Sequence, residues 1–189
     1  MKNLKTAILM VIVTTVLLGL VYPLVVTGIA QLMFPTQANG TLVKNAAGEI
    51  IGAQLIGQPF TSPGYFHARP SAANYDAAAS GGSNLGPTSA KLIERVKAAA
   101  EKLQAENPTA KVPAESLTTS ASGLDPHLSP TAAEFQIPRV AQARNQSAAN
   151  IRAVVQQFIE ARQLGLFGEP RVNVLLLNLE LDRKFPLPK

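Results

Sequence analysis

The feature that most constrains this chain is an uninterrupted apolar stretch near its N-terminus. No Asp, Glu, Lys, Arg or His occurs from Thr6 to Val43, and the run from Ala7 to Phe34 is rich in Val, Leu and Ile. A helix needs about 20 apolar residues to cross the hydrocarbon core of a bilayer. We therefore expect residues 7–34 to form one transmembrane helix, preceded by a short stub at residues 1–6.

The charges around this stretch predict its orientation. Lys2 and Lys5 precede it, whereas the first charge after it is Lys44. Because positive charge near a helix end favours the cytoplasm, we expect a cytoplasmic stub and an extracytoplasmic domain at residues 35–189 of a plasma (inner) membrane protein. A signal peptide cleaved after Ala30 is the alternative, but the apolar run is longer than the roughly 7–15 residues typical of one.

Small or weakly polar residues recur at every fourth position of the apolar stretch: Thr15, Gly19, Pro23, Thr27 and Gln31. Pro23 cannot donate a backbone hydrogen bond, so we expect a kink between Gly19 and Pro23. Small residues let a second membrane helix approach closely. This stripe is thus a candidate helix-packing surface, with ordinary membrane-helix composition as the alternative interpretation.

Composition excludes several classes of function. The chain has 189 residues, no cysteine, two histidines and a net charge of +5. A framework of disulfides and thiolate chemistry are therefore excluded, and a His-rich metal site cannot be built within one chain. No run of like charges supports nucleic-acid binding. We expect one domain after the helix, with its own core.

Periodicity and turn residues predict a mixed α+β domain. The strand candidates are a hairpin formed by Leu42-Val43 and Ile50-Ile51, short strands at 65–67 and 116–118, and a longer buried strand at 172–181. The helix candidates are 88–106, a short helix capped by Ser129 with Pro130 at its first position, then 138–145 and 147–162. The fold class is a single N-terminal transmembrane helix plus one mixed α+β extracytoplasmic domain.

Three residues of one loop, Ser122, Asp125 and His127, invite a hydrolase interpretation. A catalytic triad depends on geometry rather than on closeness in sequence, and no G-x-S-x-G elbow is present. A structural turn, with Gly123 at a positive φ, is the favoured interpretation. A membrane-anchored or exported hydrolase using these three side chains remains the alternative function.

Two further polar regions have functional and structural interpretations. The loop from Gly81 to Pro87, with Gly82, Asn84 and Gly86, resembles a phosphate cradle but lacks the Gly-Lys-Ser/Thr ending of a P-loop. Arg139, Arg144 and Arg152 predict a cationic surface, either solvated or part of a protein interface. These loops are candidate structural or interface residues, and we expect no catalytic, cofactor-binding or metal site.

Several of these segments together resemble the C chain of the Kdp-type potassium-transporting ATPases of bacteria and archaea. The resemblance covers almost the whole chain in the correct order, although Ala68 stands where many relatives have glycine. It rests on the helix end at Tyr22-Pro23-Leu24 and Thr27-Gly28, and on Leu55–Gln58, Tyr65–Ala72, Gly81–Pro87, Ser120–His127, Arg139–Arg144 and the expected strand Val174–Leu181.

The resemblance implies a non-catalytic accessory subunit of an ATP-driven potassium importer. Its partners would be a channel-like potassium-translocating chain, a P-type ATP-hydrolysing chain, a small helical chain and membrane lipid. The family is described as assisting assembly and as a catalytic chaperone that raises the ATP affinity of the hydrolysing chain. ATP and potassium would then be used by the whole complex, and we expect the effect on ATP to be indirect.

Overall fold

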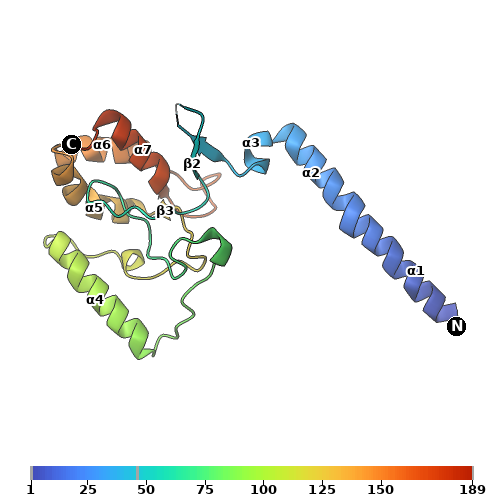
Figure 1. Cartoon of the computed structure of the whole chain (residues 1–189). Helices are drawn as coiled ribbons and strands as arrows, with labels where there is room; N and C mark the ends of the chain where they lie inside the picture. The colour runs from blue at the N-terminus through green and yellow to red at the C-terminus, as the bar shows by residue number, and fades with distance from the viewer. Residues whose placement is uncertain (1, 46, 189) are drawn as a thin grey trace. The chain divides into compact units, whose positions relative to one another are not determined.

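The computed structural model describes residues 2–45 and 47–188, apart from the side chain of Lys2. The chain divides into two compact units, Met1–Ile51 and Gly52–Lys189. Figure 1 shows the elements of both in chain order.

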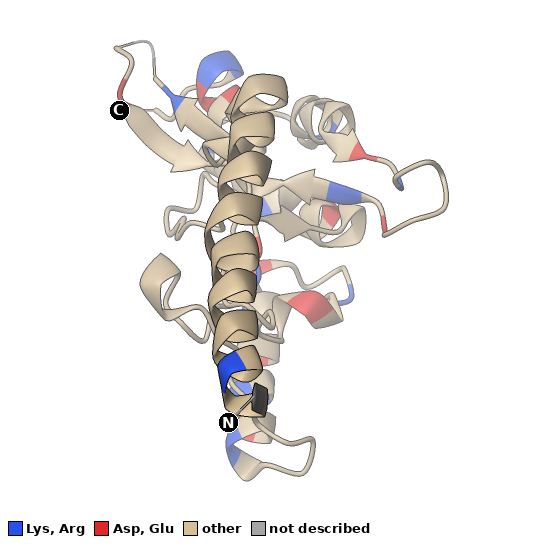
Figure 2. Cartoon of the chain, turned by 90° about the vertical axis from the view of Figure 1, so that its right-hand side faces the viewer, with Lys and Arg blue, Asp and Glu red and all other residues tan. Residues whose placement is uncertain are grey.

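The first unit is dominated by one continuous apolar helix. It consists of α1 (Lys2–Val16), the π-helical segment η1 (Leu17–Val21) and α2 (Tyr22–Met33). The 31 residues Asn3–Met33 have a mean hydropathy of 2.6, and none of their most apolar window is buried. Figure 2 shows this helix without acidic residues and with basic residues only near its N-terminus. Its length and composition suit a membrane span, as the sequence predicts.

The expected irregularity of this helix lies just before Pro23 and is a π turn. The backbone N–H of Tyr22 donates to the carbonyl of Leu17, five residues back. A proline ring crowds the carbonyl four residues before it, which is that of Gly19, and the wider turn gives that carbonyl room. π turns of this kind are a recognised way to accommodate a local insertion within an α-helix.

A short helix α3 (Pro35–Ala38) and a hairpin of β1 (Leu42–Lys44) and β2 (Ile50–Ala53) follow the apolar helix. The predicted hairpin is confirmed. Its turn is organised by the Asn45 side chain, whose Oδ1 accepts hydrogen bonds from the backbone N–H groups of Ala47 and Glu49. The boundary between the two units falls within β2, after Ile51.

The second unit is built on three helices and a small antiparallel sheet. The helices are α5 (Pro130–Ala143), α6 (Ala148–Gln157) and α7 (Val174–Lys184). The sheet has the order β3-β5-β4, from β3 (His127–Leu128), β5 (Arg171–Asn173) and β4 (Ile159–Glu160). The largest fully buried apolar side chains of the core are Phe66, Leu128, Ile137, Ile151, Leu177, Leu181, Val140, Val172 and Val174.

The predicted strand at 172–181 is wrong after its first two residues. Only Arg171–Asn173 is extended, and α7 begins at Val174. Asn173 caps this helix, because its side chain accepts a hydrogen bond from the N–H of Leu176. The buried positions follow the helical spacing of i, i+3, i+4 and i+7, at Val174, Leu175, Leu177, Asn178 and Leu181.

The helix predicted at 138–145 is not separate, because α5 runs without a break from Pro130 to Ala143 with Pro138 inside it. Ser129 caps it as predicted by accepting from the N–H of Ala132. Pro138 is exposed and the opposite face is packed, so burial holds the helix together despite the missing donor.

The remaining expectations are partly confirmed. α6 is capped by Ser147 but ends at Gln157, because the chain enters β4. No strand forms at 65–67 or 116–118; the latter overlaps a short 3₁₀ turn, η3 (Ala114–Ser116). A second 3₁₀ turn, η2, spans Ala77–Ala79.

The helix predicted at 88–106 is present as α4 (Ala90–Glu106). None of its residues is buried. Its C-terminal end meets α5, because Asn107, the residue that follows α4, donates a side-chain hydrogen bond to Phe135 O.

Candidate functional site

Four loops of the second unit meet at one place, which we call the loop junction: residues 55–58, 69–75, 80–83 and 119–127. Backbone and side-chain hydrogen bonds join all four. The N–H of Gly57 donates to Leu124 O at 2.8 Å, and Gly81 N–H to Ser122 O at 2.8 Å. Ser71 Oγ lies 2.6 Å from Gly123 O. These segments carry much of the family resemblance, and the fold brings them together.

Two glycines are required by this close approach. A Cβ at Gly57 would lie 2.7 Å from the carbonyl oxygen of Asp125. Gly123 has a φ of +69°, and its Cβ would lie 2.9 Å from Gly81 O. Only glycine adopts such a backbone at no steric cost. The junction is thus a tightly packed backbone crossing.

Ser122, Asp125 and His127 do not form a catalytic triad in this structure. Ser122 Oγ accepts a hydrogen bond from Leu124 N–H at 3.1 Å, and Asp125 Oδ1 accepts from His127 N–H at 3.0 Å. The His127 Nδ1 to Asp125 Oδ1 distance is 3.8 Å. Burial, and then the charge of Arg171, lowers the pKa of His127. These contacts are those of a structural turn, in which Asp125 also pairs with Arg69 Nη1 at 3.3 Å.

The glycine-rich loop contributes to the junction rather than to a phosphate cradle. Gly81 and Gly82 contact the 119–127 loop, and a Cβ at Gly82 would lie 3.1 Å from Ala121 O. Asn84 and Gly86 are exposed, and Asn84 has a φ of +51°. Because α4 begins only at Ala90, this loop does not open directly into a helix N-terminus.

The expectation of a cationic surface is wrong for Arg144, which is only 2% exposed. Its guanidinium donates to Gly64 O and Phe185 O, each at 2.7 Å, and pairs with Asp182 Oδ1 at 2.9 Å. It also lies over the Tyr65 ring, 5.1 Å from the centroid. Arg144 therefore joins the C-terminal end of α5 to the 64–65 loop and to α7. Arg152, by contrast, is on the surface and pairs with Glu134.

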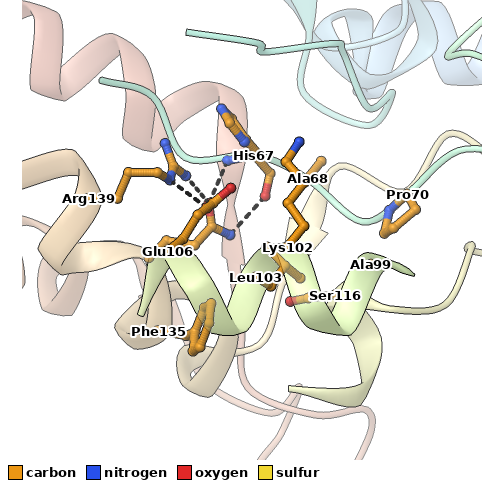
Figure 3. Close-up of a pocket in the computed structure, with 11 residues that line it drawn as sticks. His67, Ala68, Pro70, Ala99, Lys102, Leu103, Glu106, Ser116, Phe135 and Arg139 are labelled. Carbon is orange, nitrogen blue, oxygen red and sulfur yellow. Dashed lines mark hydrogen bonds and ion pairs between the residues drawn. The ribbon is translucent and has the colours of Figure 1, made fainter. Parts of the chain in front are cut away.

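Arg139 lies in a cleft between α4, α5 and the loop around His67 (Figure 3), with a volume of about 220 Å³. Its Nη1 donates to Pro63 O and Tyr65 O, and its Nη2 to Gln136 Oε1 at 2.7 Å. Its Nε lies 3.4 Å from a Glu106 carboxylate oxygen. Burial lowers the pKa of Arg139.

Sequence reasoning did not single out His67, Glu106 or Gln136 as members of this cleft. His67 N–H donates to Gln136 Oε1, and Gln136 Nε2 donates back to His67 O. Burial, and then the charge of Arg139, lowers the pKa of His67. The one available signal was that His67 and Arg139 both lie in segments that carry the resemblance.

Among the described residues, no group of three or more His, Cys, Asp or Glu side chains could hold a metal ion. In the apolar helix, Thr15 lies in α1, Gly19 in η1, and Pro23, Thr27 and Gln31 in α2, all unburied. Gln31 additionally exchanges side-chain hydrogen bonds with Asn39.

Comparison with known proteins identifies a single family. The family model for the c chain of the K⁺-transporting ATPase matches residues 4–183. A potassium-transporting ATPase KdpC subunit of Koribacter versatilis is 56% identical over 189 residues, covering 99% of this chain and 97% of the relative. The subunit of the same name from Myxococcus xanthus is 60% identical over 188 residues, covering 97% and 89%. That from Bradyrhizobium diazoefficiens is 51% identical over 197 residues, covering 97% and 98%.

Proposed function

This chain belongs to the family of c chains of K⁺-transporting ATPases, and from that premise we propose that it is a non-catalytic accessory subunit of an ATP-driven potassium importer. It holds the complex together through its membrane helix and its outer domain. Its partners are a potassium-translocating chain, an ATP-hydrolysing chain and a small helical chain.

The observation that carries this proposal is the unburied apolar helix Asn3–Met33. A helix of this composition finds its partners in lipid and in other membrane helices. Association in lipid depends on close packing of small residues rather than on a hydrophobic driving force. The stripe from Thr15 to Thr27 supplies such residues, and we propose it as the surface that contacts the partner chains.

The effect on ATP affinity is indirect in this proposal. With the N-terminus inside and residues 35–189 outside, the domain does not reach a cytoplasmic nucleotide site. The second unit contributes instead by stabilising the packing of its partners. The loop junction supports this role, because its polar groups bond to one another within a turn structure.

Enlarging Gly19 tests the assembly role. Gly19→Leu in the full complex should reduce recovery of the potassium-translocating chain with an affinity-tagged copy of this chain, because the added side chain keeps a partner helix away. Gly28→Leu is the matched control: Gly28 follows Thr27 and so points about 100° away from it around the helix, and a Cβ there meets nothing within 4 Å. Normal assembly and transport by the Gly19→Leu complex would overturn the packing surface.

The purified domain without residues 1–34 tests whether the effect on ATP affinity is indirect. Direct, saturable ATP binding by that domain would contradict the indirect mechanism.

The substitution Ser122→Ala tests the absence of catalysis. It should leave ATP-driven potassium transport intact in an assembled complex. A loss of turnover by orders of magnitude, with assembly unchanged, would support the hydrolase instead.

A further inference from the structure

The connection between β4 and β5, residues 161–170, is a hairpin loop with a defined conformation. The backbone groups of Gln163 and Phe167 exchange two hydrogen bonds of 2.9 Å, and Leu166 N–H donates to Gln163 O at 3.0 Å. Two ion pairs brace its base: Arg162 with Glu169 at 2.5 Å, and Arg171 with Glu160 at 3.0 Å. The loop is therefore held in shape by its own polar groups.

The tip of this loop exposes three large apolar side chains within four consecutive residues, 164–167. Leu164 is 88% exposed, Leu166 75% and Phe167 63%. Single exposed apolar residues are ordinary, but a contiguous group of them marks a surface that binds something. Because none of the three is buried, they contribute little to the core of the second unit.

The backbone conformation of Leu164 is unfavourable for a leucine, so the stability of the fold does not account for this residue. Leu164 has a φ of +53°, in the left-handed region that glycine and asparagine favour. Tyr75 has a similar φ of +58°, but its hydroxyl donates to Arg69 O and its N–H to Ser71 Oγ. Leu164 has no such compensation from packing. A residue with an unfavourable backbone conformation that does not stabilise the fold points to a role in binding.

We propose that Leu164, Leu166 and Phe167 insert into the interfacial layer of the lipid bilayer that the N-terminal helix spans. They would form a second, shallow contact between this chain and the membrane. Leu and Phe are side chains that partition into the boundary between headgroups and acyl chains. The charges at the base of the loop are already paired, so its tip presents an uncharged apolar group, which suits lipid without a requirement for anionic headgroups.

The covalent tether keeps the loop within reach of lipid. Residues 34–51 connect the apolar helix to the second unit. Even fully extended, such a segment spans only about 60 Å, and α3 and the β1–β2 hairpin shorten it. Association with the bilayer is then effectively intramolecular, so a weak individual contact can be well populated. The loop can contact either leaflet in this way, whatever the function of the chain.

A tryptophan probe tests the insertion directly, because the chain contains no tryptophan. Full-length Phe167→Trp is reconstituted into phosphatidylcholine vesicles that contain a lipid with a nitroxide high on its acyl chain. We expect blue-shifted emission and strong quenching by the labelled lipid. The matched control is Ile93→Trp on α4, which is 57% exposed and distant in sequence from the loop. Equal quenching of both probes, or an unquenched Phe167→Trp that acrylamide reaches freely, overturns the proposal.

Repeating the measurement in the assembled complex separates lipid from a protein partner. If Phe167→Trp is shielded from acrylamide there but is not quenched by the labelled lipid, a protein surface covers the tip and the lipid proposal is wrong. Quenching by lipid in both preparations supports it.

A second substitution separates membrane contact from folding. Leu164→Asn, made in the Phe167→Trp background, suits the left-handed backbone and removes one apolar side chain. Lipid quenching should fall several-fold while the melting temperature stays the same or rises. Unchanged quenching would refute the insertion. If that variant does not fold, Leu166→Asn is read in the same way, because Leu166 has no positive φ.

Discussion

The helices α4 and α5 are similar in length but differ in how the fold holds them. Both carry apolar residues at helical spacing. In α5, seven residues are buried, whereas in α4 none is. α5 is capped by Ser129 at one end and fixed by Arg144 at the other. Ser89 makes no side-chain cap on α4. An amphipathic pattern therefore predicts a helix, but its anchoring contacts decide whether that helix belongs to the core.

The largest effect we expect comes from breaking the anchor at the end of α5. Arg144→Met preserves much of the volume but leaves Asp182 Oδ1, Gly64 O and Phe185 O without their donor. Leaving a buried acceptor without a donor typically costs about 1–3 kcal/mol. Three acceptors lose their donor here, of which Asp182 is 40% exposed, so we expect a total loss of about 3–5 kcal/mol. Urea unfolding of the full chain in detergent should show this loss. Arg152→Met is the control, because it breaks an exposed ion pair between α6 and α5. It should change the free energy of unfolding little. Comparable losses of stability in both variants would mean that burial does not distinguish the two arginines.

A pair of apolar truncations compares the two helices directly. Ile137→Ala removes a fully buried side chain from α5 and should cost about 2–5 kcal/mol through lost burial and a cavity. Leu103→Ala on α4 removes a half-buried side chain and should cost about 1 kcal/mol. The same unfolding experiment measures both. If Leu103→Ala proves as destabilising as Ile137→Ala, α4 is part of the core and the comparison fails.

The smallest effect concerns pH and the cleft between the two helices. Burial and the nearby charge of Arg139 lower the pKa of His67, against the weaker opposing effects of the hydrogen bond with Ser62 O and the charge of Glu106. The unfolded chain therefore binds a proton near pH 6.5 that the folded chain resists, so stability falls as the pH drops through that value. The melting temperature should be lower at pH 5 than at pH 7.5. His67→Gln should reduce this difference, and an identical pH dependence in the variant would exclude His67 as its cause.

Local signals in the sequence predicted the elements whose ends they mark. Ser129 and Ser147 placed two helix starts, and the turn around Asn45 to Gly48 placed the hairpin. α7 was missed because the run Val174–Leu177 is apolar at every position, and a short apolar run does not separate a helix from a buried strand. The cap at Asn173 was the available signal.

The candidate site was less predictable than the fold, for a physical reason. The loop junction joins residues about 50 positions apart, such as Ser71 and Gly123, through hydrogen bonds that no local periodicity encodes. β3 and β4 are two residues each, too short to show alternation. Arg144 carries no local mark of burial, because its partners Gly64 and Asp182 lie far away in the sequence. Only the resemblance marked these segments in advance.

The π turn at Leu17–Val21 changes the phase of the apolar helix. In a regular α-helix, residues four apart drift by about 40° per step, so Thr15 and Thr27 would lie about 120° apart. A π turn takes up one additional residue, which removes about 100° of rotation and leaves Thr15 and Thr27 within about 20° of each other. The π turn, which contains Gly19, thus cancels the angular drift of the stripe around the helix. The small and weakly polar residues on either side of the π turn therefore form one straight seam along the helix.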